Sequence, residues 1–186
     1  MKDYSTNNII NFVLVGHATS GKSTLAESIA CNAGIIHKMG SISSGTTLSD
    51  YREYEIENQH SISLSLMNLE WQDKKFNILD TPGYLDFHGE VKSGMRVADL
   101  AAVLVSAVDG IDIGTELCCD YAEKDYEIPK LFIVNMMDKD QANFDVVLSE
   151  LKERFGRTVF PFTLPVNPGS GFNQVADVLR KQNLLY

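Results

Sequence analysis

Apolar runs of strand length alternate along the chain with segments that carry apolar residues at helical spacing. The run "IINFVLVG" is β-branched and ends in glycine, which is typical of a buried strand, and Leu25, Ile29 and Ala33 follow it at a helical period. Such patterns predict strands at 9–16, 61–71, 75–79, 100–107, 130–135 and 159–164. They predict helices at 22–34, 87–98, 114–126, 140–155 and 171–182.

Strands that alternate with helices predict an α/β fold with a mostly parallel sheet and helices on both of its faces. One pair departs from this order, because only "QDK" separates 61–71 from 75–79. This tripeptide is typical of a hairpin turn, so we expect one antiparallel strand at the edge of the sheet. Within 61–71 the apolar phase shifts between Leu66 and Met67, which predicts a bulge.

Composition limits the class of protein. The 186 residues carry a net charge of −9, which disfavours sequence-independent binding to nucleic acid, and we expect no direct sequence-specific nucleic-acid binding either. The amino-terminal stretch is polar before it is apolar, unlike a signal peptide, and no apolar run is long enough to cross a membrane. The three cysteines suggest no disulfide framework. We therefore expect a cytoplasmic protein without a membrane partner, and a monomer.

The segment "GHATSGKST" at 16–24 fits the pattern G-x-x-x-x-G-K-[ST] between a predicted strand and a predicted helix. Gly16 and Gly21 let successive backbone N–H groups point at phosphate oxygens, and the helix start adds its positive dipole end. Lys22 supplies a charge for the β- and γ-phosphates, and the hydroxyl of Ser23 is a ligand for Mg²⁺. The chain is therefore expected to have the three-layer fold of P-loop NTPases and to bind a nucleotide.

A second motif, "DTPG" at 80–83, follows an apolar strand. Asp80 lies where such proteins hold their metal, and Gly83 leaves a backbone N–H free to approach a γ-phosphate. Alone, this tetrapeptide is a common turn; behind a P-loop it indicates a guanine-nucleotide protein.

The stretch "FIVNMMDKD" at 132–140 ends a predicted strand in Asn135 and Asp138. A buried carboxylate at Asp138 accepts two hydrogen bonds from guanine that adenine cannot donate, so leaving it unpaired is expected to cost ATP about a few kcal/mol. A lysine usually follows the asparagine in guanine-recognition motifs of this kind, whereas this chain has Met136. The thioether still covers a purine face, but the cation is lost, so we expect guanine preference with weaker affinity.

Together "GHATSGKSTLAESI", "DTPGYLDFHGEVKSGMRVAD", "AVDGIDIGTE" and "NMMDKD" resemble the nucleotide domain of translation elongation factor G and the elongation factor G-like proteins. The resemblance implies a Mg²⁺-dependent GTPase that hydrolyses GTP to GDP and phosphate, slowly without the ribosome, and that acts in translocation or ribosome recycling. It implies a GTP-binding core over 1–158 and the start of an inserted subdomain over 159–186. We find no counterpart of the family's last base-contacting loop and therefore expect the core to stop before it.

The resemblance assigns roles to individual residues. Ser61 takes the place of the threonine that ligates Mg²⁺ in the GTP state, and Tyr84 takes the place of the catalytic histidine. A phenol, whose ordinary pKa is about 10, is a poor base at neutral pH but still orients water by a hydrogen bond. We expect slower or differently triggered hydrolysis. Ala18 and Thr19 replace a valine and an aspartate of the family, which makes room near the γ-phosphate and removes an acidic group.

The expected site has three groups of residues. Those in contact with the nucleotide are Gly16, His17, Ala18, Thr19, Ser20, Gly21, Lys22, Ser23, Thr24, Asp80, Thr81, Pro82, Gly83, Tyr84, Asn135, Met136, Met137 and Asp138. Those that hold the metal are Ser23, Ser61 and Asp80. Those that act in catalysis are Tyr84, Lys22 and Gly83. The acidic run at 50–57 is expected to be solvated.

Two other functions fit the motifs less well. A nucleotide-dependent switch module with little or no hydrolysis, acting by binding the ribosome or another partner, is compatible with Tyr84. A P-loop ATPase or kinase conflicts with "DTPG" and Asp138.

Overall fold

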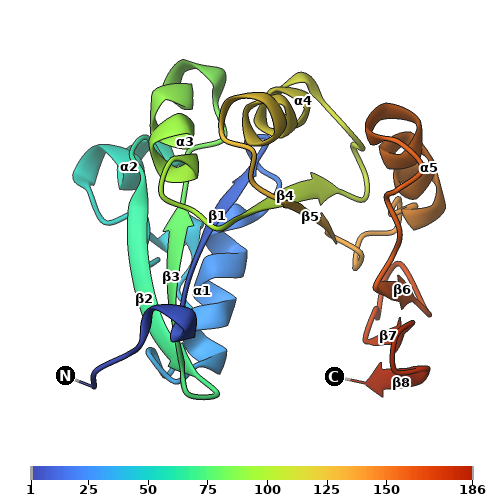
Figure 1. The fold of residues 1–186 in the computed structure, drawn as a ribbon, viewed down its shortest axis with the longest axis horizontal. Helices are drawn as coiled ribbons and strands as arrows, with labels where there is room; N and C mark the ends of the chain where they lie inside the picture. Colours follow the sequence, from blue (N-terminus) through green and yellow to red (C-terminus); the bar gives the residue numbers. More distant parts are fainter. Residues whose placement is uncertain (1, 186) are drawn as a thin grey trace. The chain divides into compact units, whose positions relative to one another are not determined.

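The computed structural model describes residues 2–185 and contains a sheet of five strands in the order β2-β3-β1-β4-β5 (Figure 1). The strands are β1 (Ile9–Gly16), β2 (Ser65–Trp71), β3 (Lys74–Asp80), β4 (Leu100–Ser106) and β5 (Lys130–Asn135). β1 pairs in parallel with β3 and β4, whereas β2 pairs antiparallel with β3. The predicted α/β class and the antiparallel edge strand are therefore confirmed, and the order and connections are those of a P-loop NTPase.

The chain divides into two compact units. The first contains the residues up to Leu104 together with Ile113–Ile133, and the second contains Val105–Asp112 and the residues from Val134 onward. None of the helices within residues 2–185 is long and apolar enough to cross a membrane.

In the first unit, alternate residues of β1 face opposite sides of the sheet. Leu14 packs with Ala26 of α1 (Lys22–Asn32) in a core cluster that also includes Ile78. Val13 faces the other side, where a Cβ on Gly94 of α3 (His88–Met95) would lie 3.0 Å from it. This two-residue period explains why a strand buried on both faces is apolar at nearly every position.

The remaining helices of the first unit are short. They are α2 (Glu53–Asn58) and α4 (Ile113–Asp120), with 3-10 turns η1 (Thr6–Asn8), η2 (Ile42–Ser44) and η3 (Leu85–Phe87), and one π-helical turn, η4 (Tyr121–Asp125). The predicted helix at 114–126 is thus an α-helix that continues as a π-turn, and the predicted helix at 87–98 ends earlier, at Met95.

The predicted bulge in β2 is wrong. β2 and β3 pair residue for residue from Ser65 opposite Asp80 to Trp71 opposite Lys74. The predicted start at residue 61 is also wrong, because the strand begins at Ser65. The apolar phase shifts between Leu66 and Met67 because Leu66 is 61% exposed, whereas Met67 and Leu69 of the same strand belong to the core side.

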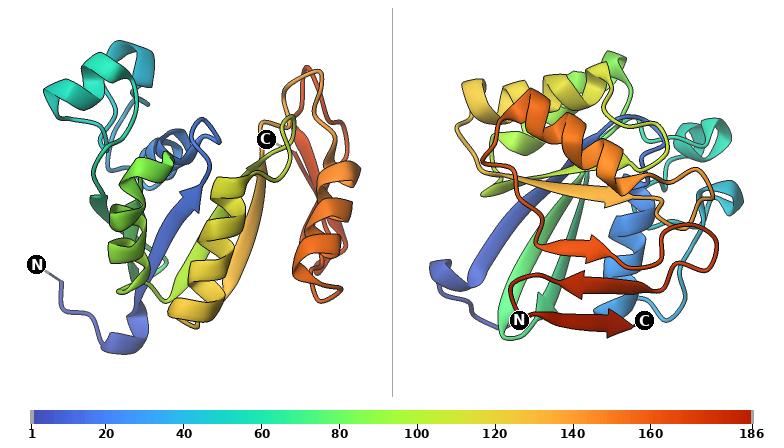
Figure 2. Two further views of the ribbon diagram at one scale, coloured as in Figure 1. Left: turned by 90° about the horizontal axis from the view of Figure 1, so that it is seen from above. Right: turned by 90° about the vertical axis from the view of Figure 1, so that its right-hand side faces the viewer.

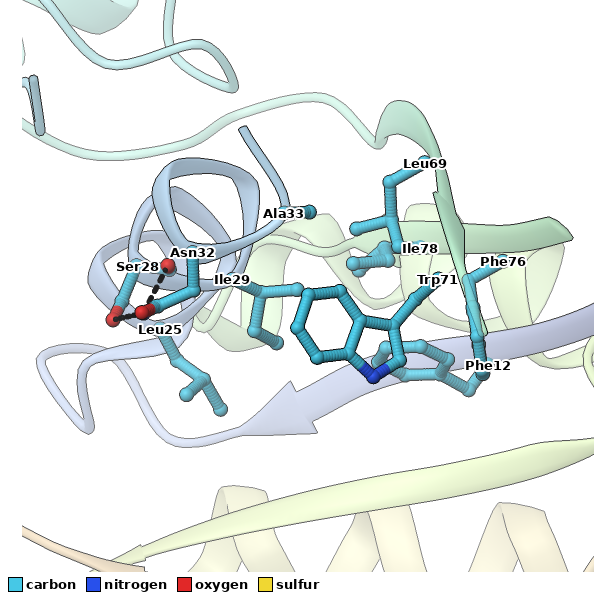
Figure 3. Close-up of a pocket in the computed structure, with 10 residues that line it drawn as sticks. All are labelled: Phe12, Leu25, Ser28, Ile29, Asn32, Ala33, Leu69, Trp71, Phe76 and Ile78. Carbon is cyan, nitrogen blue, oxygen red and sulfur yellow. Dashed lines mark hydrogen bonds between the residues drawn. The ribbon is translucent and has the colours of Figure 1, made fainter. Parts of the chain in front are cut away.

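Beside α1 the sheet carries an apolar hollow of about 450 Å³ (Figure 3). Phe12, Phe76 and Trp71 of the strands and Leu25 and Ile29 of α1 point into it. Half of the Trp71 surface is exposed. The hollow shows that α1 covers only part of this face of the sheet.

The second unit contains α5 (Phe144–Phe155) and a three-stranded antiparallel sheet of β6 (Thr163–Pro165), β7 (Gln174–Asp177) and β8 (Gln182–Leu185), which the right-hand view of Figure 2 shows side by side. α5 begins later than predicted, because Asn143 caps it by accepting a hydrogen bond from the Val146 N–H.

The predicted helix at 171–182 is wrong, because the chain forms the β7–β8 hairpin there. Asp177 accepts a hydrogen bond from the Arg180 N–H across the turn, and Lys181 takes a left-handed backbone φ angle of 55°. The apolar spacing of this segment fits a helix, but pairing with β6 and β8 satisfies the backbone of β7 and decides the structure.

Candidate functional site

The loop between β1 and α1 curls tightly at two glycines. Gly16 and Gly21 have φ angles of 132° and 93°, which other residues rarely adopt. A side chain on Gly16 would collide with the carbonyl oxygen of Leu104. Because α1 begins at Lys22, the first N–H groups of the helix adjoin the loop. The strand–loop–helix context that the phosphate motif requires is therefore present.

The Lys22 side chain is buried and folds back over this loop. Its Nζ donates hydrogen bonds to the carbonyl oxygens of Gly16, at 3.0 Å, and His17, at 2.7 Å. The side chains of His17, Thr19 and Thr24 are exposed, whereas those of Ala18, Ser20 and Ser23 are buried.

The end of β3 brings Asp80 and Gly83 to the same loop. A Cβ on Gly83 would lie 2.5 Å from the Ala18 nitrogen and 2.6 Å from Lys22 Nζ, so only glycine allows this approach. Thr81 supports the turn by donating its hydroxyl to the Leu14 carbonyl at 2.7 Å. The sequence-predicted residues of the phosphate loop and of "DTPG" thus lie together in the first unit.

The carboxylate of Asp80 is almost completely buried, with 1% of the residue exposed. Neither oxygen has a hydrogen-bond partner of good geometry. Burial raises the pKa of Asp80 to about 6, although the nearby Ser23 hydroxyl and the Lys22 ammonium oppose the rise. A buried carboxylate with open acceptor positions is suited to bind a cation or the water around it.

Ser61 lies where a second hydroxyl ligand would be needed. Its Oγ is 3.2 Å from the Oγ of Ser23, although the two residues belong to different segments of the chain. Asp50, which the sequence analysis missed, is also buried here, and burial raises its pKa while the Ser61 hydroxyl lowers it. Asp50 could not be recognised because it lies in an acidic run that reads as solvent-exposed.

Three glutamates hold the segment before β2 in place. Glu27 accepts from the N–H groups of Gly40 and Leu48, at 2.8 and 2.9 Å. Glu55 accepts from Ile62 and Ser63, both at 3.0 Å, and Glu90 accepts from Leu64 at 2.7 Å.

The expectation that the acidic run at 50–57 is solvated is wrong for Asp50 and Glu55, which are only 4% and 1% exposed. The Glu55 carboxylate is buried because its bonds to the backbone of 62–63 replace those to water. These bonds also fix the residues on either side of Ser61.

The residues present fit a magnesium ion. Among residues 2–185 no group of three or more His, Cys, Asp or Glu side chains could hold a metal alone. Mg²⁺ in nucleotide sites is held by one or two carboxylates together with hydroxyl, water and phosphate oxygens. The orphaned oxygens of Asp80 and the paired hydroxyls of Ser23 and Ser61 are such a donor set.

The expected base-reading residues lie at the end of β5 and in the loop that follows. Met136 has a left-handed φ of 62°, and its Sδ accepts a hydrogen bond from the Ser106 hydroxyl at 3.8 Å. The Asn135 carbonyl accepts from the Ala107 N–H at 2.8 Å. Met137 is buried.

Asp138 differs from the expectation of a buried carboxylate, because 62% of its side chain is exposed and Lys139 Nζ lies 3.6 Å from it. Before binding, water can solvate this carboxylate. Lack of the guanine hydrogen bonds therefore costs energy only when a bound nucleotide has removed the carboxylate from water.

Comparison with known proteins agrees with these motifs. The family model of the elongation factor Tu GTP-binding domain matches residues 7–184. The chain is 38% identical over 95% of its length to elongation factor G 2 of Borreliella afzelii, and 38% identical over 96% to the elongation factor G-like protein of Thermotoga maritima. Elongation factor G of Mycoplasma pneumoniae is 33% identical over 94% of the chain.

A solved crystal structure of a Thermus thermophilus protein has the same fold, with a TM-score of 0.90 and 31% identity over 96% of this chain. The chain covers 26% of that structure. It likewise spans about a quarter of the length of the curated relatives, 26% of the Borreliella protein and 25% of the Thermotoga protein.

Proposed function

Because the chain belongs to the elongation factor Tu GTP-binding domain family and is the GTP-binding domain of an elongation factor G-like translational GTPase, we propose that it binds GTP and GDP with Mg²⁺ and hydrolyses GTP. Hydrolysis is slow until the ribosome stimulates it, and the protein acts in the cytoplasm. The observation that carries the proposal is the meeting of the phosphate loop, Asp80 and the Ser23–Ser61 hydroxyl pair at one place.

The residues of the first unit have distinct tasks. The backbone N–H groups of the loop from Gly16 to Ser23 bind the phosphates, and Lys22 exchanges its bonds to the Gly16 and His17 carbonyls for phosphate oxygens. Ser23, Ser61 and Asp80 would hold Mg²⁺, which would supply positive charge beside the phosphate oxygens. The Gly83 N–H approaches the γ-phosphate, and Tyr84 orients the attacking water.

The residues of the second unit read the base. Asp138 accepts from the guanine N1–H and the exocyclic amine, and Asn135 supports the loop. Met136 covers the purine without the charge that a lysine would add, so the affinity for GDP is reduced but its preference over ADP is kept.

Calorimetric titration of the chain with GDP and with ADP, each with Mg²⁺, tests this proposal. We expect binding of GDP and none of ADP, and loss of GDP binding in Lys22→Ala. Met136→Lys is expected to raise GDP affinity a few-fold. Lys152→Met, at an exposed lysine of α5, is the control and is expected to leave GDP affinity unchanged. Equal binding of GDP and ADP would contradict the proposal.

The hydrolytic part is tested by single-turnover assays with and without ribosomes. The expected result is stimulation by ribosomes that disappears in Lys22→Ala. A chain that binds GTP but never hydrolyses it would be a switch module instead.

A further inference from the structure

His60 and Tyr84 come from two segments of the first unit and pack ring against ring. Their centroids are 4.9 Å apart and their planes cross at 63°, an edge-to-face arrangement. Phe87 flanks the imidazole, with its centroid 6.3 Å away. His60 directly precedes Ser61, and Tyr84 directly follows Gly83. The aromatic pair therefore adjoins the phosphate site from both segments that form it.

The position of His60 is fixed by its neighbours. Its N–H donates to the Glu55 carbonyl at 3.2 Å, and the Glu55 side chain accepts from Ile62 and Ser63 just beyond it. The backbone of His60 is therefore held on both sides along the chain, and the imidazole packs between Tyr84 and Phe87.

One polar atom of this imidazole is unsatisfied. Nδ1 of His60 is buried and has no hydrogen-bond partner of good geometry in this structure. A buried donor or acceptor without a partner is energetically costly and needs an explanation, and a partner that is bound in another state of the protein supplies one. Tyr84 is 43% exposed, and the phenol offers only one hydroxyl to a water molecule.

We propose that His60 is a second water-orienting residue, whose imidazole supplies a hydrogen bond to the water that Tyr84 also holds. This inference rests on the proposed GTP hydrolysis. The water oxygen forms a bond to the γ-phosphorus, the bond to the β–γ bridging oxygen breaks, and its electron pair stays with GDP. The water's protons end on the released phosphate and in solvent, and neither His60 nor Tyr84 is consumed.

Two substitutions separate hydrogen bonding from ring packing. His60→Phe keeps an aromatic ring against Tyr84 but has no nitrogen, whereas His60→Gln keeps a polar group but has no ring. We expect single-turnover GTP hydrolysis with ribosomes to fall about 10- to 100-fold in His60→Phe and to stay within about threefold of wild type in His60→Gln. GDP affinity is expected to change less than about twofold in both, because GDP makes no use of the attacking water.

His37→Phe is the matched control, since His37 is exposed and lies outside the pair. Tyr84→Phe combined with His60→Phe adds a second readout. If both residues orient one water, the double variant should lose little more than the slower single variant.

Some outcomes would overturn the inference. If His60→Phe is as active as wild type, or more active than His60→Gln, the histidine only packs. If the losses of the two single variants multiply, the residues do not share one water. A wild-type chain that binds GDP but shows no hydrolysis with ribosomes would overturn the proposed function itself, and an unaltered GDP affinity shows that a variant is folded.

Discussion

At the residue scale, Tyr84 is the departure from the family's sequence pattern with the largest expected effect on the rate of GTP hydrolysis. It lies beside Gly83 at the phosphate loop, where an imidazole would be a better partner for the attacking water than a phenol. The Tyr84→His variant is therefore expected to speed ribosome-stimulated single-turnover hydrolysis by about tenfold. Tyr54→His, at a tyrosine of similar exposure, is the control. Unchanged turnover would show that the phenol does not limit the reaction.

Asp80 gives a prediction about pH. Burial raises its pKa to about 6 from an ordinary value of 3.8, so the carboxyl group binds its proton more tightly in the folded state than in the unfolded state. Without Mg²⁺, the ionised carboxylate costs about 3 kcal/mol of unfolding free energy above pH 6, and this cost disappears as the pH falls towards 4.

Urea unfolding in a chelator, compared between wild type and Asp80→Asn, measures this cost. The variant should be more stable than wild type at pH 7 and about equally stable near pH 4. Asp86→Asn, at an exposed aspartate, should show no such difference. If the stability difference between wild type and Asp80→Asn does not vary with pH, burial does not destabilise the ionised carboxylate of Asp80.

At the scale of elements, the segment between α1 and β2 depends on a few carboxylates. Glu55→Ala removes two hydrogen bonds to the N–H groups of Ile62 and Ser63. Loss of both is expected to cost about 2 kcal/mol and to expose these amides. Hydrogen exchange should quicken at residues 61–64 but not in β1, and Glu57→Ala, which alters an exposed glutamate on the same helix, should leave exchange unchanged.

The sequence predicted elements well where local pattern and long-range pairing agree. β1 and α1 were recognised because a β-branched strand, a glycine loop and helical spacing follow one another, and β3 because its apolar run ends at Asp80. The β7–β8 hairpin was missed because its apolar spacing fits a helix and only pairing with β6 distinguishes the two.

The site shows the same limit. Motifs located the phosphate loop and Asp80, since their chemistry requires fixed residues at fixed spacing. The burial of Asp50 and the packing of His60 on Tyr84 were not predicted, because nothing in the local sequence shows how the long polar segment folds back. Only the resemblance placed Ser61 beside Ser23. Burial of a carboxylate is a property of the tertiary structure.

At the scale of the whole molecule, the three thiols report on opening of the fold. Cys118 and Cys119 are buried on α4, and burial raises the pKa of Cys119 to about 12. Cys31 is partly exposed. A thiol reagent at about pH 8 is therefore expected to label Cys31 readily and the other two only through unfolding. Addition of GDP and Mg²⁺ should slow labelling of the buried pair, and fast labelling of all three would contradict the buried position of α4.

The two hydrogen bonds of Lys22 to its own loop have a consequence for affinity. If Lys22 binds phosphate as proposed, the Gly16 and His17 carbonyls compete with phosphate for its ammonium, and every nucleotide meets the same internal competitor. Such competition weakens GTP, GDP and ATP by one common factor, because it acts before any base is recognised. Tightness of phosphate binding and discrimination between bases are thereby separable, and each can change in evolution without disturbing the other.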